Sequence, residues 1–141
     1  MRKLILIMSL IFTVTLSPNV VLGETVKVED LVMRKDLYYQ KSSDVPFTGT
    51  VTGQSKGKIK KGKKDGPWVD YHRNGKVSQK GTFKDGKLDG PWVFYHEDGQ
   101  VDSKGTYKDD KFDGPWVFFN RDGTARKELT GTFKNGKKIS E

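Results

Sequence analysis

A tandem repeat dominates the sequence and restricts what the chain can fold into. Residues 65–88 and 89–112 are identical at 15 of 24 positions, and a third copy at 113–136 carries two extra residues between Gly123 and Gly131. Residues 45–64 retain only part of the pattern and form a degenerate first copy. Units that recur at this length stack on their neighbours, and the outer units are atypical because they cap the stack.

Each unit is expected to form a β-hairpin. Residues 67–72 are rich in strand formers, Asn74-Gly75 is a strong signal for a two-residue hairpin loop, and residues 77–83 lead to a second turn at Asp85-Gly86. No stretch shows a helical period. The sequence therefore predicts an all-β protein, an elongated antiparallel sheet of tandem 24-residue β-hairpins.

A two-residue loop also fixes the pairing of the strands. It places Trp68 opposite Gly81 and Trp92 opposite Gly105, where a glycine leaves room for an indole ring to lie over the bare backbone. The same register pairs Asp70 with Gln79 and His72 with Val77, whereas a three-residue loop would shift these pairs by one residue. One face then carries Trp68, Trp92, Trp116, Phe83, Tyr107 and Phe133. The opposite face carries Val69, Val93, Val117, Tyr71, Tyr95, Phe119 and the stems of Lys80 and Lys104.

The first 23 residues have the pattern of a secretory signal peptide. Arg2 and Lys3 precede an apolar run at 4–16, and Pro18 interrupts it before a cleavage site near Gly23. An uncleaved membrane anchor is the alternative, because 20 uncharged residues separate Lys3 from Glu24. Cleavage leaves 24 basic and 18 acidic residues, a net charge of +6. Residues 24–44, with a short strand at 37–39, are expected to lead in and cap the first copy.

Composition argues against an enzyme. The chain has no cysteine and two histidines, so it lacks thiolate chemistry and offers little acid–base chemistry. A repeated sheet spreads its Asp and Lys side chains over an open surface and does not converge them in a pocket. We expect no catalytic residues, no cofactor and no metal. His72 and His96 occupy equivalent positions, but two strand spacings of about 9.6 Å separate them, too far for one zinc ion without further ligands.

The repeated motif resembles the MORN-variant repeat, as in the YwqK-type antitoxin family, over about residues 45–141. The resemblance rests on these positions: Gly66, Trp68, Tyr71, Gly75, Gly81, Phe83, Gly86; Gly90, Trp92, Tyr95, Gly99, Gly105, Tyr107; Gly114, Trp116, Phe119, Gly123, Gly131, Phe133, Gly136. Asp110 stands where glycine is expected, Phe119 replaces tyrosine, and the first copy lacks tryptophan. The resemblance implies a sheet of stacked hairpins that binds proteins or membranes, with an antitoxin role in some members.

Two features are candidates for partner binding. The tryptophan row is either a stacking platform or the packed seam of the sheet, and the lysines at the turns are either a ladder of positive charge or a solvated edge that blocks strand addition. The candidate partner-binding residues are Trp68, Trp92, Trp116, Phe94, Phe118, Lys84, Lys108 and Lys134.

These observations favour an exported, periplasmic or secreted, non-catalytic protein that binds a protein partner, with an antitoxin or immunity-like role resting on the resemblance. The alternative is an envelope-associated module that adheres to anionic lipid or a cell-surface polymer. Nucleic acid is not expected as a ligand of an exported chain. The sequence leaves the oligomeric state open.

Overall fold

The computed structural model describes residues 23–140, so residues 1–22 of the predicted signal peptide lie outside the described residues. The described part is almost entirely β. Its elements are β1 (Glu24–Lys27), η1 (Val28–Asp30), β2 (Leu31–Arg34), β3 (Leu37–Gln40), β4 (Gly49–Thr52), β5 (Ser55–Lys60), β6 (Lys63–Tyr71), β7 (Val77–Lys84), β8 (Lys87–Leu88), β9 (Gly90–Tyr95), β10 (Val101–Lys108), β11 (Lys111–Phe112), β12 (Gly114–Phe118), β13 (Gly131–Lys134) and β14 (Lys137–Ser140). Across residues 23–140, no helix has the length and apolar character needed to cross a membrane.

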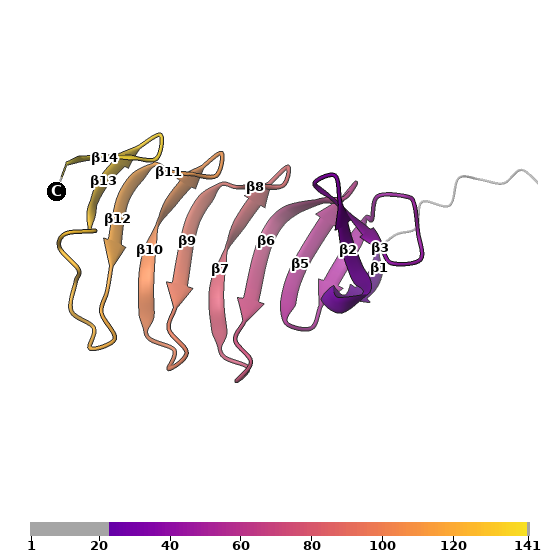
Figure 1. Ribbon diagram of the computed structural model, residues 1–141, viewed down its shortest axis with the longest axis horizontal. Coiled ribbons are helices and arrows are strands. Elements are labelled where there is room, and N and C mark those ends of the chain that lie inside the picture. Colours follow the sequence, from indigo (N-terminus) through magenta and orange to yellow (C-terminus); the bar gives the residue numbers. More distant parts are fainter. Residues whose placement is uncertain (1–22, 141) are drawn as a thin grey trace, which may run out of the picture.

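Twelve strands form one elongated sheet (Figure 1), in which the strands follow one another nearly in chain order. The order is β1-β4-β5-β6-β7-β9-β10-β12-β13-β14, with β8 beside β7 and β11 beside β10. All pairs are antiparallel except β1 with β4, which is parallel. The predicted all-β fold of stacked hairpins is confirmed.

Tight two-residue turns line one edge of the sheet. In the turn between β7 and β8, Asp85 and Gly86 both have positive φ, 50° and 82°, as a type I′ turn requires. Asp110 takes the glycine position of the next turn at φ 66°, and its carboxylate accepts a hydrogen bond of 2.7 Å from the Leu88 N–H. That contact to the preceding hairpin helps to hold a non-glycine residue in this conformation.

The loops at the other edge are longer than expected. His72 N–H donates to the Lys76 carbonyl and Gly75 N–H donates to the His72 carbonyl, so three residues form the loop instead of two. The predicted pairing of His72 with Val77 is therefore wrong, because Tyr71 pairs with Val77. A bulge beside this pair restores the predicted register farther along the hairpin, where Asp70 pairs with Gln79 and Trp68 with Gly81.

Each indole ring lies over a glycine, but on the preceding strand. A Cβ atom added to Gly105 would lie 2.2 Å from Trp116 Cδ2, and one added to Gly81 would lie 2.1 Å from Trp92 Cδ2. The expectation that the Trp92 ring covers Gly105 is thus wrong, although these two residues do pair across the hairpin. Every tryptophan in the sheet has a glycine on both neighbouring strands, and the ring leans toward the N-terminal one. The rings consequently interlock consecutive hairpins.

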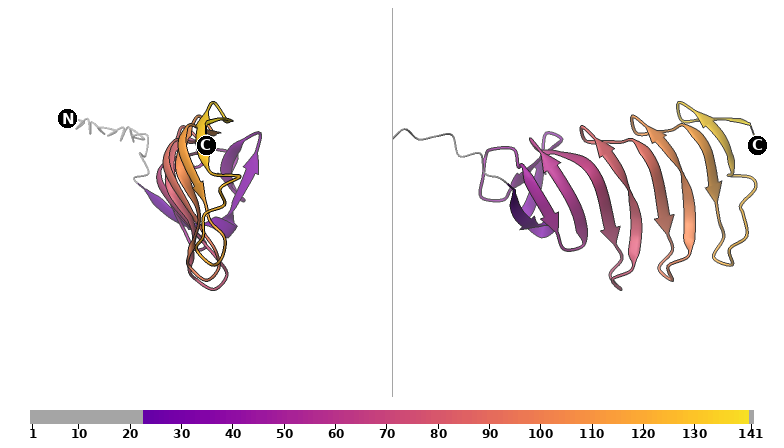
Figure 2. Two further views of the ribbon diagram at one scale, coloured as in Figure 1. Left: turned by 90° about the vertical axis from the view of Figure 1, so that its left-hand side faces the viewer. Right: turned by 180° about the vertical axis from the view of Figure 1, so that it is seen from behind.

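A small second layer covers one end of the sheet. Strands β2 and β3 form a separate hairpin that stands beside the N-terminal end, as the end-on view in Figure 2 shows. The core beneath it contains Val26, Phe47, Val51, Ile59 and Trp68, and Val28, Leu31, Tyr38 and Phe83 pack against it. The rest of the sheet is a single layer that buries its rings against one another.

Candidate binding surfaces

We call the side of the sheet that carries the three indole rings the Trp face. Trp68, Trp92 and Trp116 are only 2%, 1% and 1% exposed, so the burial supports the packed-seam alternative over the stacking platform. The role of these three residues in contacting a partner stays a prediction. The indole N–H groups of Trp92 and Trp116 donate to the carbonyls of Thr82 and Thr106, at 3.1 and 2.9 Å.

The rings form one continuous stack along the Trp face. Phe83 meets the rings of Trp68 and Trp92 edge-on at 5.9 and 5.1 Å, and Tyr107 meets those of Trp92 and Trp116 at 6.3 and 5.0 Å. Edge-to-face pairs at such distances add stabilisation beyond the area they bury. These aromatic side chains therefore hold neighbouring hairpins together.

Phe94 and Phe118 form the outer layer of this stack. Their rings lie nearly parallel to Trp92 and Trp116, at centroid distances of 6.0 and 5.8 Å, and both side chains are half-buried. The equivalent residue in the first full repeat is Asp70, whose carboxylate accepts hydrogen bonds from Ser55, Gln79 and the Trp68 indole. The apolar surface thus begins one repeat after the N-terminal layer.

Under the N-terminal layer the Trp face is occupied by a lysine. The Lys64 ammonium lies 4.2 Å from the Trp68 ring centroid, 4.9 Å from that of Phe83 and 5.8 Å from that of Tyr38. Burial lowers the pKa of Lys64, and the nearby charge of Asp70 opposes that shift. Sequence reasoning missed this site, although the signal is present: Leu88 and Phe112 hold the same repeat position, which marks it as an inward one.

The opposite side of the sheet, which we call the Lys–Val face, shields its rings with lysines. Lys56 Nζ lies 5.1 Å from the Tyr71 ring centroid, and Lys80 Nζ lies 5.7 Å from that of Tyr95. Both lysines are exposed while the two tyrosines are half-buried. This face is therefore polar and charged at its surface, unlike the Trp face beyond Trp68.

The lysines at the turn edge are exposed but not isolated from acids. Lys84, Lys108 and Lys134 lie on successive turns as predicted. The hollow between the turns of β7–β8 and β10–β11 is lined by three lysines and four aspartates. Lys134 Nζ lies 3.1 Å from Asp113, and its hydrogen bond is the main reason that the pKa of Asp113 is lowered. The ladder of positive charge is thus interrupted in the middle of the sheet.

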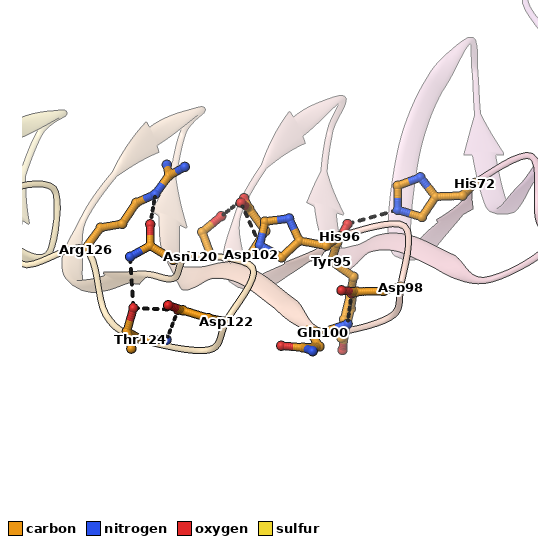
Figure 3. Close-up of polar contacts among 11 residues, drawn as sticks. His72, Tyr95, His96, Asp98, Gln100, Asp102, Asn120, Asp122, Thr124 and Arg126 are labelled. Carbon is orange, nitrogen blue, oxygen red and sulfur yellow. Dashed lines mark hydrogen bonds and ion pairs between the residues drawn. The ribbon is translucent and has the colours of Figure 1, made fainter.

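The loop edge holds the two histidines (Figure 3). His72 Nε2 lies 2.9 Å from the Tyr95 carbonyl, so it links one loop to the next hairpin. His96 Nε2 is buried without a hydrogen bond and lies 3.5 Å from Asp102. Within residues 23–140, no group of three or more potential ligand side chains could hold a metal ion. The histidine row has different local partners at each repeat.

The chain is a repeat protein, because consecutive hairpins pair side by side in one extended sheet. Two segments, residues 64–85 and 88–109, match the family model described as MORN repeat variant, so the protein contains MORN repeats. No curated protein matches the chain. MORN repeats are generally non-catalytic modules that bind membranes or proteins. The match does not extend to the antitoxin family.

Proposed function

We propose that the mature chain is an exported, non-catalytic module that binds a protein partner across the Trp face beyond the N-terminal layer. One observation carries the proposal. The aromatic stack continues from Trp68, where β2 and β3 cover it, to Trp116, where no second layer covers it within residues 23–140, and Phe94 and Phe118 are its half-exposed surface. The β2–β3 hairpin covers the Trp face at Trp68, and we expect another apolar protein surface to cover the part beyond it.

The signal-like N-terminus and the resemblance to an antitoxin family favour a particular kind of partner. A chain that leaves the cytoplasm meets its partner in the periplasm or outside the cell. An immunity-like role, in which the module neutralises a toxin after export, satisfies both indications. The interrupted charge of the turn edge favours a protein partner over adhesion through Lys84, Lys108 and Lys134, since acids lie among them.

The test is a crosslinking pull-down from the exported fraction of the native cell with residues 24–141 as bait. The informative variant is Phe94→Asp with Phe118→Asp, because the fold already accepts an aspartate at the equivalent Asp70. The matched control is Tyr95→Asp with Phe119→Asp, which alters two half-buried aromatic residues on the Lys–Val face.

We expect one discrete protein to be captured at low and high salt by the native chain and the control variant, and to be lost from the Phe94/Phe118 variant. Thermal unfolding of all three chains checks that the variants remain folded. Equal capture by both variants would reject the Trp face as the binding surface. A toxicity assay with the captured protein then tests the immunity-like role.

A further inference from the structure

A single file of lysines crosses the Lys–Val face. Strand pairing places one residue from each of six neighbouring strands in one row, and lysine alternates with valine along it. The row consists of Lys56, Val69, Lys80, Val93, Lys104 and Val117. The three lysines are exposed and the three valines are half-buried. Successive lysines are two strands apart, a separation of about 9.6 Å.

The rows on either side of this file are uncharged apart from Lys58 on β5 and Asp102 on β10. Toward the turn edge, each paired position holds a proline and a threonine: Pro67 with Thr82, Pro91 with Thr106, and Pro115 with Thr132. Toward the loop edge lie aromatic residues and valines: Tyr71 with Val77, Tyr95 with Val101, and Phe119. Asp102 is the one acidic residue in these three rows, at the bulge opposite Phe119, and its carboxylate accepts a hydrogen bond from Ser103 and lies 3.5 Å from His96 Nε2.

The lysine file differs from the turn edge in the residues that lie between its lysines. The turn lysines have aspartates in the same hollow, whereas the lysines of the file are separated by valines alone. A line of charges, one per hairpin, suits a linear polyanion better than a planar surface, because a plane would engage charges spread along the strands as well as across them. The second layer of β2 and β3 packs on the Trp face and leaves the file open.

We propose that the lysine file binds a linear acidic polysaccharide in which every second sugar carries a carboxylate. The distance between neighbouring lysines is close to the length of two linked sugars in an extended chain. Each lysine would pair with one carboxylate, and the ammonium groups of Lys56 and Lys80 lie over the Tyr71 and Tyr95 rings. The threonine hydroxyls of the adjoining row supply hydrogen-bonding groups for sugar hydroxyls. This site lies on the opposite side of the sheet from the proposed protein surface and does not depend on it.

The test measures binding of a fluorescently labelled hyaluronan octasaccharide, which has a carboxylate on alternate sugars, to residues 24–141 at low ionic strength. The informative variant is Lys80→Gln with Lys104→Gln. The matched control is Lys84→Gln with Lys108→Gln, which removes the same number of charges from exposed lysines on the turn edge. Thermal unfolding establishes that each variant keeps the native fold.

We expect the octasaccharide to bind, the Lys80/Lys104 variant to bind it about 25-fold more weakly, from about fivefold per exposed ion pair, and the control to change by no more than about twofold. Raising the salt should weaken binding to the native chain. Absence of binding, or equal losses in both variants, would overturn the proposal. Tighter binding of an oligothymidylate of equal charge, or of phosphatidylglycerol vesicles, with the same dependence on Lys80 and Lys104 would also overturn it, in favour of nucleic acid or lipid.

Discussion

Replacing Gly105 with alanine tests the interlock between hairpins most directly. The added Cβ would lie 2.2 Å from Trp116 Cδ2, whereas ordinary contact begins at 3.4 Å, so the ring must move by about 1.2 Å. That movement strains the stack with Phe112, whose ring centroid lies 4.0 Å from that of Trp116, and the 2.9 Å bond from the indole to Thr106. Overpacking costs about 1–3 kcal/mol and a weakened hydrogen bond about 1 kcal/mol, so we expect a loss of about 2–4 kcal/mol.

A double-mutant cycle identifies the ring that is responsible. Urea unfolding followed by far-ultraviolet circular dichroism gives the free energy of unfolding for Gly105→Ala alone and in the Trp116→Leu and Trp92→Leu backgrounds. The cost of Gly105→Ala should largely disappear when Trp116 is replaced, because the clashing atoms are gone. It should persist when Trp92 is replaced. Additive costs in the Trp116→Leu background, or a vanishing cost in the Trp92→Leu background, would refute the assignment.

Three further predictions concern single side chains. Asp110→Ala should lower the free energy of unfolding by about 2 kcal/mol, because alanine tolerates positive φ poorly and cannot accept the Leu88 N–H, while Asp110→Gly should be nearly neutral; melting temperatures compare them. Lys64→Leu should stabilise the fold by about 1 kcal/mol near neutral pH. The pKa of Lys64 is lowered in the folded state, so the unfolded chain binds more protons and the native protein gains stability as the pH rises toward 10.5. The difference in free energy of unfolding between the native protein and Lys64→Leu should therefore shrink over this pH range. Urea titrations at several pH values measure this difference. Lys134→Ala should move the pKa of Asp113 up toward its ordinary value, as carboxyl chemical shifts report; an unchanged titration would exclude the Lys134 bond as its cause.

The sequence was sufficient to predict the hairpins, their register over most of their length and the two faces of the sheet. Alternation in the strands and the turn signals act locally, so the pairs Trp68 with Gly81 and Trp92 with Gly105 follow from them. The direction in which each ring leans could not be predicted. Every indole has a glycine on both sides, and only the twist and packing of the assembled sheet decide between them.

Two other differences have related causes. The loop between His72 and Lys76 has three residues, and Gly75 closes it with a positive φ of 83°. An Asn-Gly pair permits this three-residue loop as readily as the two-residue loop. The buried position of Lys64 depends on the N-terminal layer, which covers it from outside the repeat. The repeat pattern predicts the contacts that recur in every copy, but it does not predict the contacts that the N-terminal layer makes with one copy only.

Contacts in this sheet join each hairpin mainly to the next, since each indole sits on the glycine of the adjacent strand. The number of hairpins is therefore not set by closure of a barrel or by a shared central core. An in-frame gene duplication of one 24-residue unit would add one hairpin and about 9.6 Å of length, and would leave both ends unchanged. In such a protein, length itself is a heritable trait that can change in whole units without a new fold.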